Sequence, residues 1–156
     1  MLTFERVTEQ QLDIIREIIH SNRTYNEWEN GSPVRTDEEL KKEYFHNNPN
    51  RYTYFIKADE TYIGLLEYLE RNEKDGLPWL GLLIIHGDYQ GYGFGTNAYY
   101  TLEDQLKQKG ITRLRLGILR KNVKAKVFWE SLGFSYFETK SSNKGILVDC
   151  YEKEWS

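Results

Sequence analysis

The sequence predicts an α/β fold in which helices pack against one mixed β-sheet. Segments with the alternating or continuously apolar pattern of strands are interspersed with segments whose apolar residues recur at helical spacing. The run at 79–85 is apolar without alternation, as expected for a central strand buried on both faces. The predicted element order is β-α-α-β-β-β-α-β-α-β-β, in a single domain over residues 1–156.

The N-terminal part of the chain predicts one strand and two helices. Residues 2–7 alternate in the manner of a short strand. A Thr-x-x-Gln motif at 8–11 and a Thr-x-x-Glu motif at 36–39 have the spacing of capping boxes, and each predicts the start of a helix. Residues 23–35 between these helices lack any period and contain an Asn-Gly pair and a proline, so we expect a loop there.

Three predicted strands occupy the middle of the chain. Residues 51–57 and 61–70 are rich in β-branched and aromatic side chains, which favour strands. An Asp-Gly pair at 75–76 is a hairpin signal and leads into the central strand at 79–85.

The C-terminal part predicts two further helices and three strands. An amphipathic helix over 96–110 ends at a glycine, and the segment 112–119 alternates like a strand. Asn122 is suited to cap a helix that Gly133 ends, and two strands surround a turn at 143–145.

The composition argues against several classes of protein. A formal net charge of −3 argues against a nucleic-acid partner. Charged residues among the first twenty argue against a secretory signal, and the longest apolar run falls short of the about 20 residues that span a bilayer. The lone cysteine, Cys150, excludes an intrachain disulfide, and its alternation with apolar neighbours predicts a buried strand residue. We therefore expect a cytoplasmic protein without a metal cofactor.

A glycine-rich turn lies between the central strand and the following helix. Gly91, Gly93 and Gly95 alternate in it, and its backbone N–H groups would meet the positive end of the helix dipole, which suits an anionic phosphate. The turn lacks the lysine of a phosphate-binding P-loop, and its Gly-x-Gly-x-Gly spacing differs from the dinucleotide fingerprint. Both nucleotide interpretations fail on spacing, so the turn predicts a phosphate site but does not identify the ligand.

These residues resemble a known motif. Residues 83–95 are similar to the acetyl-CoA-binding motif of the GNAT superfamily of N-acetyltransferases, with Gly87 in place of the usual proline. A second motif of the family is matched in spacing within 122–134, and the resemblance covers nearly the whole chain. Its matching residues are Asn122, Ala125, Phe128, Trp129, Leu132, Gly133 and Phe134.

The resemblance implies a site for acetyl-CoA. Backbone amides of the glycine turn would hold the pyrophosphate, main-chain groups of the central strand would pair with the pantetheine arm, and the second motif would line the other side. Asn122 would serve both as a helix cap and as a contact. The implied cofactor residues are Leu83, Ile84, Ile85, Gln90, Gly91, Tyr92, Gly93, Phe94, Gly95, Thr96, Asn122, Ala125, Phe128 and Trp129.

The sequence does not identify the general acid or the general base. The family's usual general acid is a tyrosine, and here Trp129 takes its place; an indole N–H donates a hydrogen bond but releases no proton, so it either stabilises the leaving sulfur or packs the channel. The central strand carries no carboxylate, which leaves Glu67 and His86 as candidate bases. Glu67 either faces the cleft or lies on a solvated face, and a turn histidine is most often exposed. A backbone N–H at a bulge near Ile85 is the expected oxyanion donor.

The acceptor side is suggested by Trp28, which lies in a polar segment between Glu27 and Glu29. These residues favour a cationic small-molecule amine, although acidic loops are also common in acidic proteins. The predicted function is acetyl-CoA-dependent acetylation of a primary amine. Two alternatives stay open, an acetyl-CoA-binding sensor without turnover and an acetyltransferase for protein N-termini or lysines; a homodimer is compatible with the sequence.

Overall fold

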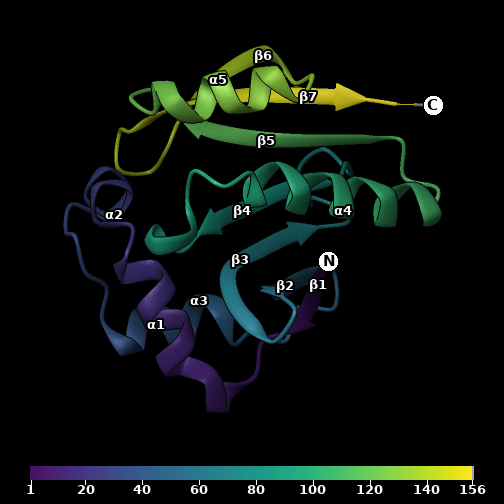
Figure 1. The fold of residues 1–156 in the computed structure, drawn as a ribbon. Helices are drawn as coiled ribbons and strands as arrows, with labels where there is room; N and C mark the ends of the chain where they lie inside the picture. Colours follow the sequence, from purple (N-terminus) through teal and green to yellow (C-terminus); the bar gives the residue numbers. More distant parts are fainter. Residues whose placement is uncertain (156) are drawn as a thin grey trace.

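The computed structural model describes residues 1–155, and its centre is a seven-stranded sheet in the order β1-β2-β3-β4-β5-β7-β6 (Figure 1). Neighbouring strands are antiparallel except for the parallel pair β4 and β5. The strands are β1 (Leu2–Arg6), β2 (Arg51–Ala58), β3 (Thr61–Leu69), β4 (Trp79–Ile85), β5 (Arg113–Leu119), β6 (Ser135–Ser141) and β7 (Leu147–Glu154).

The helices lie between the strands in the chain and cover both faces of the sheet. They are α1 (Leu12–His20), α2 (Arg23–Asn30), α3 (Asp37–Tyr44), α4 (Phe94–Gln108) and α5 (Val123–Ser131), with short 3₁₀ helices η1 (Glu9–Gln11) and η2 (Gly87–Tyr89). The predicted mixed α/β fold is confirmed, and β4 is central as expected. Among residues 1–155, no helix is long and apolar enough to cross a membrane.

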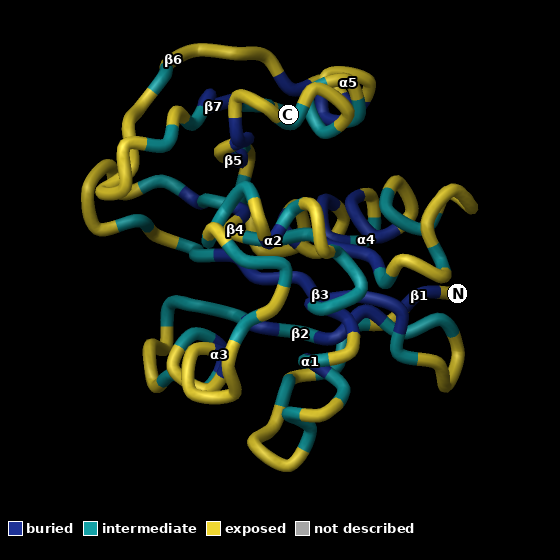
Figure 2. The backbone as a smooth tube through the Cα atoms, turned by 90° about the vertical axis from the view of Figure 1, so that its left-hand side faces the viewer, coloured by how far each residue is buried: buried dark blue, intermediate teal, exposed yellow. Residues whose placement is uncertain are grey.

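Two apolar clusters form the core, one on each face of the sheet. Alternating residues of β3 serve both, because successive side chains of a strand point to opposite faces. Leu66 packs in the cluster that contains the buried residues of α4 and α5, and Leu65 packs with the isoleucines of α1 and Leu40 of α3. Figure 2 shows this buried layer along β2, β3 and β4, whereas β6 at the edge is mostly exposed.

The strand β3 curves strongly where it passes β4 (Figure 1). Gly64 of β3 pairs with Ile85 of β4, and a Cβ atom added at Gly64 would approach the carbonyl oxygen of Ile84 to 2.4 Å. Any other residue would push the two strands apart at this position. The close approach fixes the position of the C-terminal half of β4.

The expected loop at 23–35 was wrong in its first part, because residues 23–30 form α2. The helix ends at Gly31, whose φ is 78°, and its buried side is held by a polar residue. Asn26 donates from Nδ2 to the carbonyl oxygens of Ile19, at 2.8 Å, and Pro33, at 3.1 Å. A helix anchored by an asparagine leaves no apolar period in the sequence.

Candidate active site

The strands β4 and β5 pair only where β4 begins. The paired residues are Trp79 with Arg115 and Leu80 with Leu116, and beyond them the two strands share no register. The remainder of β4 continues to pair with β3 on its other side. One edge of β4 is therefore left without a neighbouring strand, as the resemblance implied.

The register with β3 shows which amides of β4 point toward this free edge. The backbone N–H of His86 donates to the carbonyl oxygen of Ile63 at 2.8 Å. Bonded and non-bonded pairs alternate in an antiparallel ladder, so Ile84 and Leu82 also bond to β3. The amides of Leu83 and Ile85 point the other way, toward β5, and are available to a ligand.

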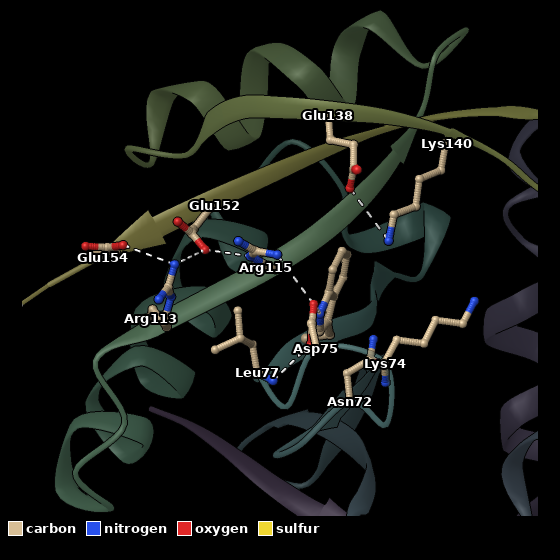
Figure 3. Close-up of polar contacts among 11 residues, drawn as sticks. Asn72, Lys74, Asp75, Leu77, Arg113, Arg115, Glu138, Lys140, Glu152 and Glu154 are labelled. Carbon is tan, nitrogen blue, oxygen red and sulfur yellow. Dashed lines mark hydrogen bonds and ion pairs between the residues drawn. The ribbon is translucent and has the colours of Figure 1, made fainter.

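The beginning of β4 is held against β5 by a ladder of charged groups (Figure 3). Arg115 on β5 donates from Nε to Glu152 on β7 at 2.6 Å and from Nη1 to Asp75 in the β3–β4 turn at 3.4 Å. Asp75 also accepts the indole N–H of Trp79 at 2.8 Å, and Arg113 donates to Glu152 at 2.6 Å. This charged ladder joins the hairpin, β5 and β7 at the closed end of the strand pair.

The glycine turn lies at the other end of β4 and opens α4. Gly91 and Gly93 have φ values of 87° and 81°, which side chains other than glycine rarely adopt. The first helical bond of α4 runs from the amide of Asn97 to the carbonyl of Gly93, at 3.1 Å. The amides of residues 94–96 consequently have no partner within the helix and lie at the positive end of its dipole. The turn can bind an anionic group.

The second wall of the site is α5. Asn122 caps it as predicted, with its Oδ1 accepting the amide of Ala125 at 3.0 Å. Phe128 lies so close to the glycine turn that a Cβ on Gly95 would be 3.4 Å from its Cζ atom. The start of α4 and α5 are therefore within side-chain contact of each other at this position.

Trp129 belongs to the hydrophobic core. Its side chain is 8% exposed and packs edge to face with Tyr99, Phe128 and Phe134, at centroid distances of 4.9 to 5.7 Å. None of the described residues 1–155 forms a hydrogen bond with its indole N–H. Trp129 therefore packs beneath the site, and its indole N–H is not among the buried polar atoms that lack a hydrogen-bond partner.

Gln90 links the glycine turn to two other elements. Its Nε2 atom donates to the carbonyl oxygen of Ile85 at 2.8 Å and to Oδ1 of Asn22 at 2.9 Å. Asn22 donates in turn to the same carbonyl at 3.2 Å. These bonds attach the end of β4 to the start of α2, so the free edge of β4 has a fixed outline on the α2 side.

Glu67 lies on the face of the sheet opposite α4. Its side chain is on the same side of β3 as Leu65, and only 8% of the residue is exposed, so the solvated alternative was wrong. Oε1 accepts from Nη2 of Arg51 at 2.7 Å, and Oε2 accepts from the hydroxyl of Thr53 at 2.7 Å. Glu67 and Gly81 line a pocket of about 500 Å³. A buried carboxylate therefore borders a pocket beside the point where β4 leaves β5.

The other two catalytic candidates lie at the C-terminal end of β4, Ile85 as its last residue and His86 directly after it. His86 is half-buried, and its Nδ1 accepts the amide of Asp88 at 3.0 Å, which occupies it as the cap of η2. The only register shift between β3 and β4 lies at Gly81, where Leu80 pairs with Tyr68 and the next pair involves Leu82. The expected bulge near Ile85 was therefore wrong, because Ile85 pairs regularly with Gly64. The Ile85 amide still points toward the free edge.

The predicted acceptor residues lie on α2, beside the turn between β6 and β7 (Figure 1). Glu27 is exposed, whereas Trp28 and Glu29 are half-buried. Burial raises the pKa of Glu29, Glu43 on α3 raises it further, and the cation of Lys144 in the β6–β7 turn opposes the shift. The helix and the turn thus approach each other across the end of the sheet.

Sequence reasoning missed the partners of Glu67, which are Arg51, Thr53 and His46. Thr53 is directly opposite Glu67 in the register of β2 and β3, a relation that becomes readable only once the hairpin register is known. Among residues 1–155, no group of histidine, cysteine or acidic side chains is arranged to hold a metal ion. The arrangement offers amides for a phosphate and an extended ligand, with one buried carboxylate nearby.

The model of the "Acetyltransferase (GNAT) family" matches residues 16–134 of the chain. None of the curated proteins compared with the chain matches it.

Solved structures share the fold over nearly their full length. An acetyltransferase from Thermus thermophilus is 23% identical, with a TM-score of 0.84 and coverage of 99% of this chain and 97% of that one. The spermidine N-acetyltransferase of Vibrio cholerae in complex with CoA and spermine is 21% identical, with a TM-score of 0.73 and coverage of 98% and 95%. The ribosomal-protein-S18-alanine N-acetyltransferase of Escherichia coli is 15% identical, with a TM-score of 0.72 and coverage of 100% and 95%.

Proposed function

The chain belongs to the acetyltransferase (GNAT) family, and from that membership we propose that it transfers the acetyl group of acetyl-CoA to a primary amine. The observation that carries this proposal is the free edge of β4 next to the glycine turn. Strand pairing with β5 stops after Leu80, so the amides of Leu83 and Ile85 are available. The amides that begin α4 lie at the end of the same strand.

These groups fit the two parts of the cofactor. The amides of residues 91–96 hold the pyrophosphate, because uncommitted N–H groups at a helix N-terminus favour an anion. The amides of Leu83 and Ile85 hold the pantetheine arm as an added strand would be held, with Asn122 and Phe128 on the α5 side. Bound acetyl-CoA supplies the thioester carbonyl that the amine attacks.

The protein then has to position the acceptor, remove a proton from its ammonium form and stabilise the oxyanion. The amide of Ile85 is proposed as an oxyanion donor, because it points toward the free edge. A carboxylate for the proton is available in Glu67, which lies on the face of the sheet opposite α4 and borders the pocket at Gly81. The leaving thiolate needs little help from an acid, since a free thiol has a pKa of about 8.5. Trp129, a tryptophan in the core, is consistent with a reaction that proceeds without an acid at that position.

The acceptor is proposed to be a small cationic amine that approaches along α2. Trp28 and Glu29 on α2 are half-buried, and Glu27 adds a second carboxylate at the surface. One similar structure is a spermidine N-acetyltransferase and another is a ribosomal-protein-S18-alanine N-acetyltransferase, so both acceptor classes belong in the test.

A thiol-release assay tests the proposal, with acetyl-CoA and a panel of polyamines, amino acids, aminoglycosides and peptides. We expect CoA release that depends on a small amine. Release with peptides alone would contradict the small-molecule acceptor. Silence across the panel with an acetyl-CoA-dependent rise in melting temperature would favour a sensor, and silence without that rise would contradict the cofactor assignment.

The role of Glu67 has its own test. Glu67→Gln keeps the shape and loses the base, so kcat should fall about 100-fold near neutral pH, in the range of general-base catalysis. The acetyl-CoA-dependent rise in melting temperature should be unchanged. A variant with wild-type kcat would remove Glu67 from the mechanism.

A further inference from the structure

A chain of three polar side chains leads away from Glu67 across the sheet. Thr53 on β2 donates its hydroxyl proton to Oε2 of Glu67 at 2.7 Å. The same hydroxyl oxygen lies 2.9 Å from Nε2 of His46, in the segment between α3 and β2. Of Glu67, Thr53 and His46, only Glu67 has a role suggested by the sequence.

The neighbours of His46 fix its tautomer. The single hydroxyl proton of Thr53 is used on Glu67, so the bond between Thr53 and His46 has to be donated by Nε2–H. The other ring nitrogen, Nδ1, accepts the backbone amide of Asn48 at 3.3 Å. Neutral His46 with its proton on Nε2 satisfies both contacts, and the bonds then run in one direction from His46 through Thr53 to Glu67.

The hydrogen bond between Thr53 and Glu67 is buried and therefore stabilises the arrangement more than a surface contact would. Thr53 is 3% exposed and Glu67 is 8% exposed, and a buried hydroxyl or carboxylate is costly unless it is hydrogen-bonded. Thr53 donates to Oε2 and Arg51 donates to Oε1, so each oxygen of the Glu67 carboxylate has a hydrogen-bond donor from β2. With both oxygens held, the carboxylate has one orientation beside the pocket at Gly81.

Charged groups from two strands act on Glu67 and His46. Arg51 on β2 is the paired cation, and Arg6 at the end of β1 acts on His46 from further away. Burial lowers the pKa of His46 and Arg51 lowers it further, although Glu67 opposes the shift. Burial raises the pKa of Tyr44 on α3 well above its usual value, so that phenol stays neutral, and β4 carries no titratable side chain.

Protonation of His46 would alter the chain in two ways. Nδ1 would lose the Asn48 amide as a donor, because both ring nitrogens then carry protons. A second cation would also lie 3.9 Å from Oε2 of Glu67, which favours the ionised carboxylate and weakens it as a base. The neutral form of His46 is therefore the one that serves proton removal.

We propose that Thr53 and His46 are positioning residues, which hold the Glu67 carboxylate in the orientation that accepts a proton from the acceptor ammonium. The inference rests on the proposed function, in which Glu67 is the base. In that step an N–H bond of the ammonium breaks, an O–H bond forms on Glu67 directly or through a water, and the neutral amine attacks. The proton then leaves Glu67 for solvent through the pocket.

Two matched pairs of variants test the positioning role. Thr53→Val removes the hydroxyl and keeps the shape, and Thr53→Ser restores the hydroxyl. His46→Leu removes both ring nitrogens, and His46→Gln returns an N–H donor near the position of Nε2. The readouts are the pH dependence of kcat with an amine that the wild type acetylates, the KM for acetyl-CoA, and the melting temperature.

We expect kcat of Thr53→Val to fall about tenfold across the pH profile, because the Glu67 carboxylate loses the hydrogen bond that orients it. Thr53→Ser should lie within threefold of the wild type, and the KM for acetyl-CoA should not change. The kcat of His46→Leu should fall about threefold, and the kcat of His46→Gln should recover toward that of the wild type. In the unliganded wild type, the ¹⁵N shifts of His46 should show a neutral ring protonated on Nε2 at pH 7.

The outcomes separate the inference from the function on which it rests. An active wild type that Glu67→Gln impairs, together with Thr53→Val of wild-type profile, would contradict the positioning role alone. A proton on Nδ1 of His46 would contradict the direction of the chain. A wild type that is inactive with every amine would overturn the function and this inference together. If Thr53→Val fails to fold, the two His46 variants decide the question.

Discussion

The two ends of β4 differ in how their polar groups are used. At the closed end, Trp79 and Leu80 pair with β5, and the charged ladder around Arg115 holds the hairpin to the sheet. At the open end, Leu83 and Ile85 direct amides to a side where no strand pairs with them. One strand therefore serves structure at its start, and under the proposed function its end is left to bind the cofactor.

The difference shows how a sheet can leave backbone groups of one strand unpaired without losing its integrity. Unpaired backbone groups are costly when buried, so a strand can leave them free only where a ligand or water reaches them. The closed end fixes the direction in which β4 leaves β5, and the bonds of Gln90 and Asn22 to Ile85 fix its far end. The free amides are thus held in place from both sides.

The largest expected effect is at the open end. Gly93→Val forces a β-branched residue into a φ of 81° and blocks the approach of an anion to the turn, so we expect acetyl-CoA affinity to fall about 30-fold, equivalent to about 2 kcal/mol. Gly110→Val is a matched control, with a φ of 78° beyond the other end of α4 and no atom within 4 Å of an added Cβ. Both should lose similar stability in a thermal melt. Equal loss of affinity in both variants would contradict the assigned phosphate site.

The next effect concerns Asp149, a buried residue of β7 that forms an ion pair with Lys126 on α5, the second wall of the site. Lys126 on α5 lowers the pKa of Asp149 to about 2, with smaller help from Thr139 and Arg120 and with burial opposing. A carboxyl with a lowered folded-state pKa stabilises the protein above its unfolded pKa, and that contribution is lost as pH falls from about 4 to about 2. The shift is equivalent to about 2 kcal/mol. Asp149→Asn should be destabilised by this order at pH 6, and its difference from the wild type should shrink below pH 4 in urea unfolding.

A pH-independent difference in stability between Asp149→Asn and the wild type would contradict this prediction. If the free energies of unfolding of Asp149→Asn and the wild type differed by the same amount at pH 6 and pH 3, the ion pair with Lys126 would not be the source of the stability. The wall of the site would then be held by packing alone.

A smaller effect is expected at the closed end. Arg115→Leu removes the ion pairs to Glu152 and Asp75, and because the arginine side chain is 21% exposed the cost should be about 1 kcal/mol in urea unfolding. Acetyl-CoA affinity should stay within twofold. Glu138→Gln is the control, since its pair with Lys140 is about half exposed and should contribute almost nothing. A fall in affinity as large as that of Gly93→Val would show that the two ends are not separable.

The sequence predicted the features that depend on neighbouring residues in the chain. The capping box at Thr36 is present, with Thr36 Oγ1 accepting the amide of Glu39 at 3.2 Å and the Glu39 carboxylate accepting the amide of Thr36 at 3.0 Å. The glycine turn and the Asn122 cap are also where the motifs placed them. Each of these signals lies within a few residues, so no knowledge of tertiary contacts was needed.

The features that the sequence did not predict depend on register and on polar anchors. The helix α2 is held by Asn26, which has no hydrophobic signal. The register shift at Gly81 and the partners of Glu67 follow from how β2, β3 and β4 align, and single-strand patterns leave that alignment open. The glycine turn and the helix cap were therefore predictable from the sequence, and the arrangement of the candidate catalytic groups was less so.

The most direct test of the contrast within β4 is site-resolved amide hydrogen exchange, with and without saturating acetyl-CoA. We expect the amides of Leu83 and Ile85 to exchange quickly in the free protein and to become protected by acetyl-CoA. The amides of Leu82 and Ile84 should be protected in both states, because they bond to β3. Protection of all four amides without ligand, or no change at Leu83 and Ile85 when acetyl-CoA is bound, would contradict the account.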